Sequence, residues 1–286
     1  MKISVIVPVF NTAAFIDRCM TALLEQDYPE SDYEVIAVDN GSSDDSLERL
    51  ARFPVTVIRE DKRGSYAARN AGVRMASASI LAFTDSDCAP RADWLRTVES
   101  ALDTPGCLVV QGKRRLASTS SLLQAINTYE FTKDEFTLNG NNALKYYGYT
   151  NNMATHRRAY ERFGPFVERD RGADTIFVRS VVDGESCDAV RYNPHMVIDH
   201  LEMNRFSDYL KKMFIYGRSR KRYRHLKVTE ALGLSDRFKI FHTVTQKGNY
   251  SLLQSASFAG AMACSMAAWQ AGSWAGALES LHRTEK

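Results

Sequence analysis

Short apolar runs alternate with amphipathic stretches over the first eighty or so residues of the chain. We predict strands at residues 3–7, 33–38, 55–59 and 80–83, and the first and last of these runs are typical of buried strands. The stretches between them have helical spacing and cover residues 13–26, 44–52 and 66–76. Such alternation predicts an α/β fold with a parallel, Rossmann-like sheet, right-handed crossovers and helices on both faces.

The pattern is less regular further along. Helices are predicted at 93–102, 157–163, 175–182 and 206–222, and strands at 108–111, 190–192 and 196–198. The segment 113–149 fits either a helix or a loop. We find no internal repeat and no low-complexity linker, so we place one domain boundary, near residue 200.

Two carboxylates directly follow the fourth apolar run. Asp85 and Asp87 are separated by one residue, at the end of a strand that we expect to be buried. Ligands of open α/β sheets collect at the carboxyl ends of strands, and Mg²⁺ or Mn²⁺ prefers hard oxygen ligands. A turn with a helix cap explains the same pattern. The surrounding sequence favours the metal site.

The glycine motifs of two other nucleotide-binding folds are missing from the sequence. No G-x-G-x-x-G follows the first strand, and no G-x-x-x-x-G-K-[ST] occurs anywhere. These absences argue against a dinucleotide fold and a P-loop.

Composition and charge describe an ordinary globular protein of 286 residues. The net charge of +3 is only mildly basic and does not indicate a nucleic-acid partner. Five scattered cysteines without a C-x-x-C pair indicate reduced thiols. Because Met1-Lys2 leads directly into a predicted strand, we expect no signal peptide and a cytoplasmic protein.

Taken together, the ordered motifs resemble family 2 of the glycosyltransferases, which have the GT-A fold. The matching segments are residues 5–11 (VIVPVFN), 38–44 (VDNGSSD), 68–72 (ARNAG), 84–87 (TDSD) and 172–174 (GAD). The resemblance implies a GT-A domain at 1–200, with a nucleotide-binding half at 1–111 and an acceptor-side, catalytic half at 112–200. Residues 201–286 then form a basic helix and an uncharged helical tail.

Three positions depart from the family pattern. Asn40 stands where the family more often has aspartate, and Ala173 replaces the acid that usually precedes the catalytic aspartate. Residues 216–219 (YGRS) lie where processive synthases carry Q-x-x-R-W, which favours transfer of a single sugar.

The resemblance also implies a donor site. Asp39 accepts a hydrogen bond from a pyrimidine ring N–H, and Arg69 donates to a ring carbonyl. Each has a plainer explanation, a turn cap for Asp39 and a surface ion pair for Arg69. The residues expected to bind the nucleotide sugar are Pro8, Val9, Phe10, Asn11, Asp39, Arg69, Asp85, Ser86, Asn152 and Arg218.

Asp174 is the expected catalytic base, because inverting transfer needs a group that takes the proton of the acceptor hydroxyl. A helix cap before Thr175 is the alternative, and one carboxylate can do both. The expected ligands of Mg²⁺ or Mn²⁺ are Asp87, Asp85 and His200, although a histidine at a strand end is often purely structural.

The C-terminal region has several interpretations. Arg218 on the basic helix either closes over the diphosphate or faces an anionic membrane, and a solvated charged face is the plain alternative. No charge occurs between Lys247 and Glu279. We rank an interfacial or homodimer-packing helix first, a helix of the soluble fold second and a membrane span third.

The sequence therefore predicts an inverting, metal-dependent glycosyltransferase that moves one sugar from a nucleotide diphosphate donor, preferably a UDP-sugar. The expected acceptor is a saccharide or a lipid-linked hydroxyl in surface polysaccharide or glycoconjugate assembly, at the inner face of the cell membrane. The alternatives are a non-catalytic sugar-nucleotide-binding scaffold and, less favoured, a nucleotidyltransferase.

Overall fold

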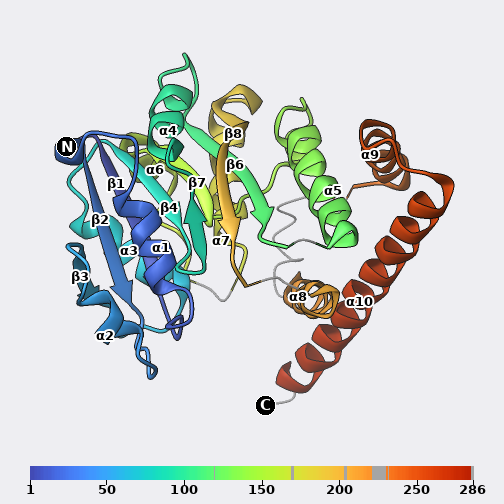
Figure 1. Cartoon of the computed structure of the whole chain (residues 1–286), viewed down its shortest axis with the longest axis horizontal. Coiled ribbons are helices and arrows are strands. Elements are labelled where there is room, and N and C mark those ends of the chain that lie inside the picture. Colours follow the sequence, from blue (N-terminus) through green and yellow to red (C-terminus); the bar gives the residue numbers. More distant parts are fainter. Residues whose placement is uncertain (119, 169–170, 203–204, 221–229, 231, 285–286) are drawn as a thin grey trace. The chain divides into compact units, whose positions relative to one another are not determined.

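The chain divides into two compact units. The computed structural model describes residues 1–118, 120–168, 171–202, 205–220, 230 and 232–284 (Figure 1). The first unit comprises Met1–Arg115 and Thr137–Leu201, and the second comprises Leu116–Phe136 and Glu202–Lys286.

One eight-stranded sheet organises the first unit. Its strands are β1 (Ile3–Val9), β2 (Tyr33–Asp39), β3 (Thr56–Arg59), β4 (Ile80–Thr84), β5 (Cys88–Pro90), β6 (Val109–Leu116), β7 (Asn152–His156) and β8 (Val190–His200). They lie in the order β3-β2-β1-β4-β7-β6-β8-β5. β1 to β4 pair with one another in parallel, whereas β7 is antiparallel to both β4 and β6, and β5 is antiparallel to β8.

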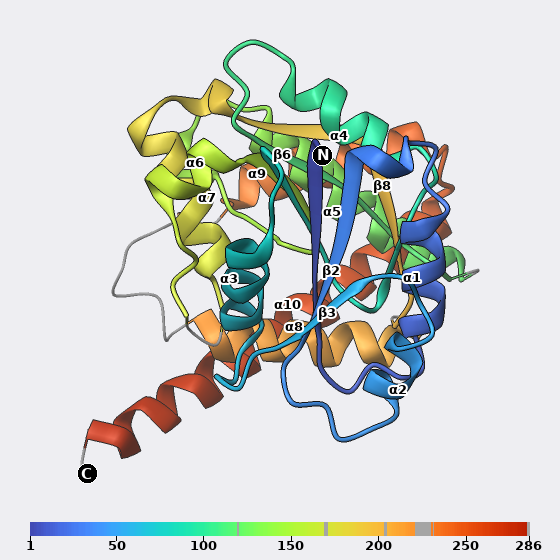
Figure 2. The same ribbon diagram turned by 90° about the vertical axis from the view of Figure 1, so that its left-hand side faces the viewer.

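Helices cover both faces of this sheet (Figure 2). They are α1 (Ile16–Leu24), α2 (Ser46–Leu50), α3 (Ser65–Met75), α4 (Trp94–Leu102), α6 (Arg157–Phe163) and α7 (Ala173–Gly184). Val5 and Val7 share one core with Met20 of α1 and Trp94 of α4. Ile6 points to the other face, where α3 packs so closely that a Cβ on Gly72 would lie 2.5 Å from its side chain.

Four helices belong wholly or largely to the second unit, namely α5 (Ser121–Leu138), α8 (Phe206–Arg220), α9 (Leu234–Lys247) and α10 (Leu252–Thr284). They share their own core, which includes Tyr129, Tyr209, Ile240 and Phe258. The described residues also contain three short 3₁₀ helices, at Glu30–Asp32, Ala143–Lys145 and Cys187–Ala189. Within the described residues, no helix combines the length and the apolar character needed to cross a bilayer.

Several sequence predictions need correction. The strands predicted at 190–192 and 196–198 are one strand, β8, because exposed Pro194 and His195 interrupt its apolar pattern without ending it. The ambiguous segment 113–149 contains the end of β6 and all of α5. The basic helix is described as far as Arg220, and residues 221–222 of its predicted range lie outside the described residues.

Candidate active site

The carboxyl ends of β1, β2 and β4 lie at one edge of the sheet. Their parallel register pairs Val9 with Asp39 and Ile6 with Phe83, so the segments that follow these strands emerge together. In an open α/β sheet this edge is where ligands bind.

Side-chain hydrogen bonds fasten the loop after β1 to the loop after β2. The amide oxygen of Asn11 accepts from the Ser43 N–H at 2.8 Å, and the Ser42 hydroxyl accepts from the Asn11 N–H at 3.2 Å. The Asp44 carboxylate accepts from the Ala13 N–H at 3.0 Å. The two loops therefore form one continuous rim.

The predicted base-binding residues lie on this rim. Asp39 is buried, and its carboxylate accepts from the N–H groups of Gly41 at 3.2 Å and Ser42 at 3.0 Å. The turn-capping role that the sequence left open for Asp39 is thus present. Its carboxylate is held in a fixed orientation, which suits recognition of a planar base.

The residues at the end of β1 differ in their exposure to solvent. Val9 is buried, Pro8 is half-buried, and Phe10 is exposed. The guanidinium of Arg63 lies 4.6 Å from the centre of the Phe10 ring, in cation–π geometry. Phe10 therefore presents an aromatic face beside a positive charge at this edge.

Asn40, the departure from the family pattern, makes three hydrogen bonds to the loop before α3. Its side-chain nitrogen donates to the carbonyls of Glu60 and Lys62, both at 2.8 Å, and its oxygen accepts from the Gly64 N–H at 2.8 Å. The side chain thus ties the end of β2 to the loop that leads into α3.

Arg69 on α3 forms an ion pair with Asp85, directly after β4. The arginine side chain is only 3% exposed and the aspartate side chain 35% exposed, so the pair sits at the boundary between protein and solvent. The guanidinium also lies 5.5 Å from the centre of the Tyr66 ring. Ser86, between the two acidic residues, is buried.

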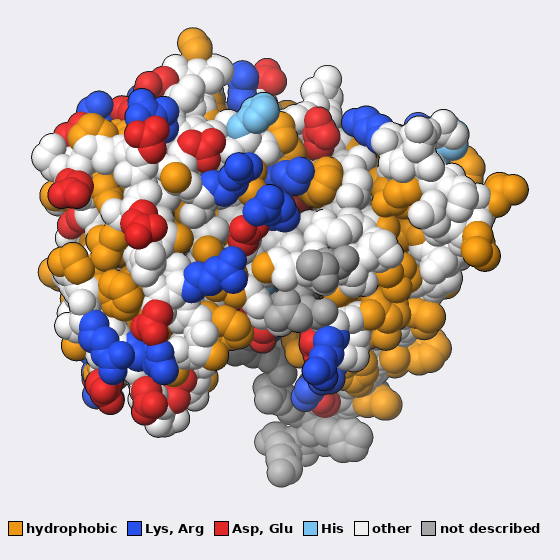
Figure 3. Space-filling model, viewed as in Figure 1, with side chains coloured by type: hydrophobic (Ala, Val, Ile, Leu, Met, Phe, Trp, Pro, Cys, Tyr) orange, Lys and Arg blue, Asp and Glu red, His pale blue; other side chains and the backbone are white. Residues whose placement is uncertain are grey.

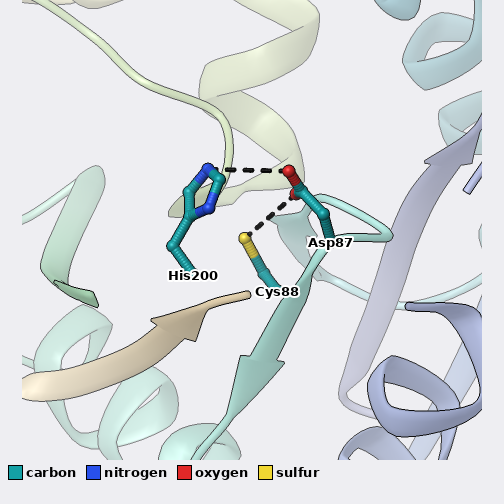
Figure 4. Close-up of side chains that lie close together, drawn as sticks. All are labelled: Asp87, Cys88 and His200. Atoms are coloured by element: carbon teal, nitrogen blue, oxygen red, sulfur yellow. Dashed lines mark hydrogen bonds and ion pairs between the residues drawn. The ribbon is translucent and has the colours of Figure 1, made fainter. Parts of the chain in front are cut away.

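Asp87 and His200 come together through strand pairing. The antiparallel register of β5 and β8 places Cys88 opposite His200 and brings the end of β8 to Asp87. The imidazole Nε2 of His200 lies 3.6 Å from Asp87 Oδ2, and the Cys88 thiol lies 3.5 Å from Asp87 Oδ1. Figure 4 shows the three side chains pointing toward one another.

These donors fit a divalent cation. A carboxylate oxygen and an imidazole nitrogen 3.6 Å apart can both ligate an ion that lies about 2.1 Å from each. Burial, together with the nearby carboxylates of Asp87 and Asp85, raises the pKa of the Cys88 thiol. Cys88 therefore stays protonated and donates to Asp87, which leaves the carboxylate and the imidazole as the donors.

Asp174 lies in the first turn of α7, after Gly172, whose φ of 88° is left-handed. Its Oδ1 accepts from the Thr175 N–H at 2.8 Å. Burial raises the pKa of the Asp174 carboxyl, and this effect is partly offset by hydrogen bonds from Thr175 and Tyr66 and by the charge of Arg69. Tyr66 thus contacts both Asp174 and Arg69, the partner of Asp85.

Asn152 is placed differently from the other predicted donor-binding residues. It is fully buried, and its nitrogen donates to the carbonyls of Lys113 and Met196, both at 2.9 Å. Its oxygen accepts from the indole N–H of Trp94 at 2.8 Å. These bonds join β6, β7, β8 and α4, so the side chain stabilises the sheet behind the rim.

Arg218 belongs to the second unit. It lies on α8, and its Nε donates to the carboxylate of Glu279 on α10 at 3.1 Å. All other predicted site residues belong to the first unit.

Two contributors escaped the sequence reasoning. Tyr66 precedes Arg69 by three residues, so helical spacing puts both on one face of α3, and this spacing was the available signal. Gly148 lets its segment approach α7, because a Cβ there would lie 2.4 Å from the carbonyl oxygen of Asp174. No local sequence pattern predicts the contact between Gly148 and Asp174.

Comparisons with known proteins agree with this geometry. The model of the family described as "Glycosyl transferase family 2" matches residues 4–164. Glycosyltransferase AglE of Haloferax volcanii is 33% identical over 226 residues, which cover 76% of this chain and 72% of AglE. A poly(ribitol-phosphate) beta-glucosyltransferase of Bacillus spizizenii is 37% identical over 94 residues, but they span only 15% of that protein.

Solved structures share the fold at low identity. Mannosyltransferase PcManGT from Pyrobaculum calidifontis, in complex with GDP-Man and Mn²⁺, has a TM-score of 0.66 at 21% identity, covering 98% of this chain and 87% of that one. S. aureus TarS 1-349, in complex with UDP-GlcNAc, has a TM-score of 0.54 at 16% identity, covering 94% and 81%.

Proposed function

Because the chain belongs to family 2 of the glycosyltransferases, we propose that it is an inverting, metal-dependent enzyme that transfers one sugar from a nucleotide diphosphate donor. A UDP-sugar is the preferred donor. The acceptor is a hydroxyl of a saccharide or a lipid-linked carrier in surface glycoconjugate assembly, and peripheral membrane contact through the C-terminal region is part of the proposal.

The donor binds at the rim formed by the loops after β1 and β2. Asp39, held by two backbone N–H groups, accepts from the ring N–H of the base. Phe10 offers an exposed aromatic face at the same edge. Arg69, positioned by Asp85, directs its charge toward the base and ribose.

A divalent cation would be held by Asp87 and His200, with Asp85 nearby. When bound, it supplies positive charge that stabilises the departing diphosphate. The residues themselves supply the geometry, because the pairing of β5 with β8 brings Asp87, directly before β5, beside His200 at the end of β8. Mg²⁺ and Mn²⁺ both suit this donor set.

Asp174 acts as the base. The acceptor oxygen attacks the anomeric carbon, its proton passes to the Asp174 carboxylate, and the bond from that carbon to the diphosphate oxygen breaks. The single observation that carries the proposal is that Tyr66 connects the two motifs: it donates to Asp174, and its ring centre lies 5.5 Å from the guanidinium of Arg69, which pairs with Asp85. The carboxylates of two distant motifs therefore serve one site.

The proposal is tested by measuring release of UDP or GDP from a panel of UDP- and GDP-sugars with Mn²⁺. Asp174→Asn should lower turnover by about 10²–10⁴ while donor affinity is retained, because the amide cannot accept the proton. Asp183→Asn is the matched control, since Asp183 lies on the same helix and pairs with Arg179 at 2.6 Å. Near-normal turnover of Asp174→Asn would remove it as the base.

The same assay addresses the alternatives. Calorimetric binding of a donor without turnover, for every donor tested, would favour a non-catalytic sugar-nucleotide-binding protein. Release of pyrophosphate instead of a nucleoside diphosphate would indicate a nucleotidyltransferase.

A further inference from the structure

Large apolar side chains are concentrated on the outer surface of α9 and α10 (Figure 3). The six most exposed large hydrophobic residues of the described chain all lie on these helices: Leu252 (92%), Leu234 (83%), Leu253 (82%), Phe238 (69%), Trp274 (63%) and Leu278 (60%). Exposed apolar residues scattered singly need no explanation, but a concentration of them marks an interaction surface.

These exposed residues are not the ones that form the hydrophobic core of the second unit. On α9, Ile240 and Val244 already fill the core of the second unit, whereas Leu234 and Phe238 share the opposite, solvent-facing side at i, i+4 spacing. On α10, Phe258 is buried in the same core, while Leu252 and Leu253 open the helix almost fully exposed. Each helix therefore carries a second apolar surface.

The C-terminal region, residues 202–286, differs in net charge from the rest of the protein. Residues 202–286 contain 14 basic and 6 acidic residues, a net charge of +8, whereas residues 1–201 contain 23 basic and 28 acidic residues, a net charge of −5. Eight of the basic residues lie within 211–227, directly before α9 along the chain. Apolar side chains next to a concentration of positive charge suit an anionic bilayer surface.

We propose that Leu234, Phe238, Leu252 and Leu253 insert into the headgroup region of an anionic lipid bilayer, to which the net positive charge of residues 202–286 attracts the protein. A second copy of the chain is a poorer partner for these four residues. A dimer formed through them would bring together two C-terminal regions that each carry a net charge of +8. The inference specifies the membrane contact of the proposed function and is independent of the sugar donor.

Vesicle sedimentation tests the inference with the full-length protein. Binding to vesicles of phosphatidylglycerol and phosphatidylcholine should exceed binding to phosphatidylcholine alone and should weaken in high salt. The double variants Leu234→Ser/Phe238→Ser and Leu252→Ser/Leu253→Ser should each lower the partition coefficient about tenfold or more. The matched control is Leu47→Ser/Met75→Ser, two exposed apolar residues of the first unit, which should bind like wild type.

Folding and function are followed separately. Circular dichroism and nucleoside diphosphate release without lipid should be the same for wild type and the surface variants, since none of the four residues lies in the proposed site. Equal binding to both vesicle types, or wild-type binding by both double variants, would overturn the inference. So would a lipid-free dimer that the variants dissociate. A wild type that binds anionic vesicles but releases no nucleotide would refute the proposed function instead.

Discussion

At the scale of single residues, Asn40 needs an amide because it donates to two carbonyls and accepts from one N–H. An aspartate there would face the carbonyl oxygens of Glu60 and Lys62 without a proton to donate. A buried polar group left without its partner costs about 1–3 kcal/mol. We expect Asn40→Asp to lower the free energy of unfolding by that amount, measured by urea denaturation at pH 7.

Asn11→Asp is the control for that prediction. The side-chain oxygen of Asn11 acts as an acceptor, toward the Ser43 N–H, and an aspartate preserves this role. Equal losses of stability in the two variants would mean that the lost donors of Asn40 are unimportant.

Asp174 gives a pH prediction at the same scale. Burial raises the pKa of its carboxyl above the ordinary value of about 3.9, and a base must be deprotonated to act. Turnover is therefore fully present above the raised pKa and falls as the pH drops through it. The measurement is kcat against pH at saturating donor, with circular dichroism to exclude acid unfolding. An acidic limb at the ordinary aspartate pKa would contradict the prediction.

At the scale of elements, α8 and α10 depend on glycine for their close approach. A Cβ on Gly217 would lie 1.9 Å from the carbonyl oxygen of Trp269, whereas a Cβ on Gly260 would meet nothing within 4 Å. Alanine is the better helix former by about 1 kcal/mol. We therefore expect Gly260→Ala to raise the melting temperature and Gly217→Ala to lower it, measured by circular dichroism. A higher melting temperature for both would contradict this packing.

The elements also show what the sequence could predict. The predicted strands β1 to β4 are confirmed, because mainly apolar residues mark each of them, although β3 is short and mostly exposed. β7 was not predicted as a strand, because its buried residues include the polar Asn152 and Thr155. Hydrogen bonds satisfy both side chains in the interior, but a search for hydrophobic periodicity does not detect polar residues. α5 was ambiguous because its apolar side chains pack into a separate core of the second unit.

The same limit applies to the site. Motifs marked Asp85, Asp87 and Asp174 along the sequence, and the resemblance suggested His200. The contact between Asp87 and His200, however, depends on the antiparallel pairing of β5 with β8, and β5 is only three residues long. Such long-range register has no local signature, so the contact could be expected only from the family.

At the scale of the whole molecule, the residues predicted to bind the donor do not all belong to one unit. Arg218 of the second unit pairs with Glu279, and every other predicted donor-binding residue lies in the first unit. Arginine binds phosphate bidentately, so Arg218 must exchange Glu279 for the diphosphate if it closes over the donor. The carboxylate of Glu279 and the diphosphate of the donor then compete for the guanidinium of Arg218.

This competition predicts opposite effects of two substitutions. Glu279→Gln frees Arg218 and should tighten UDP binding in the presence of Mn²⁺ by about threefold to tenfold, whereas Arg218→Gln should weaken it by a similar factor, about 1 kcal/mol. Arg237→Gln is the control, because it removes a cation of the same unit whose Nε donates to the Leu232 carbonyl at 3.1 Å. The dissociation constants are measured by calorimetry. Unchanged affinity in both the Arg218 and the Glu279 variants would exclude Arg218 from the donor site and leave binding to the first unit alone.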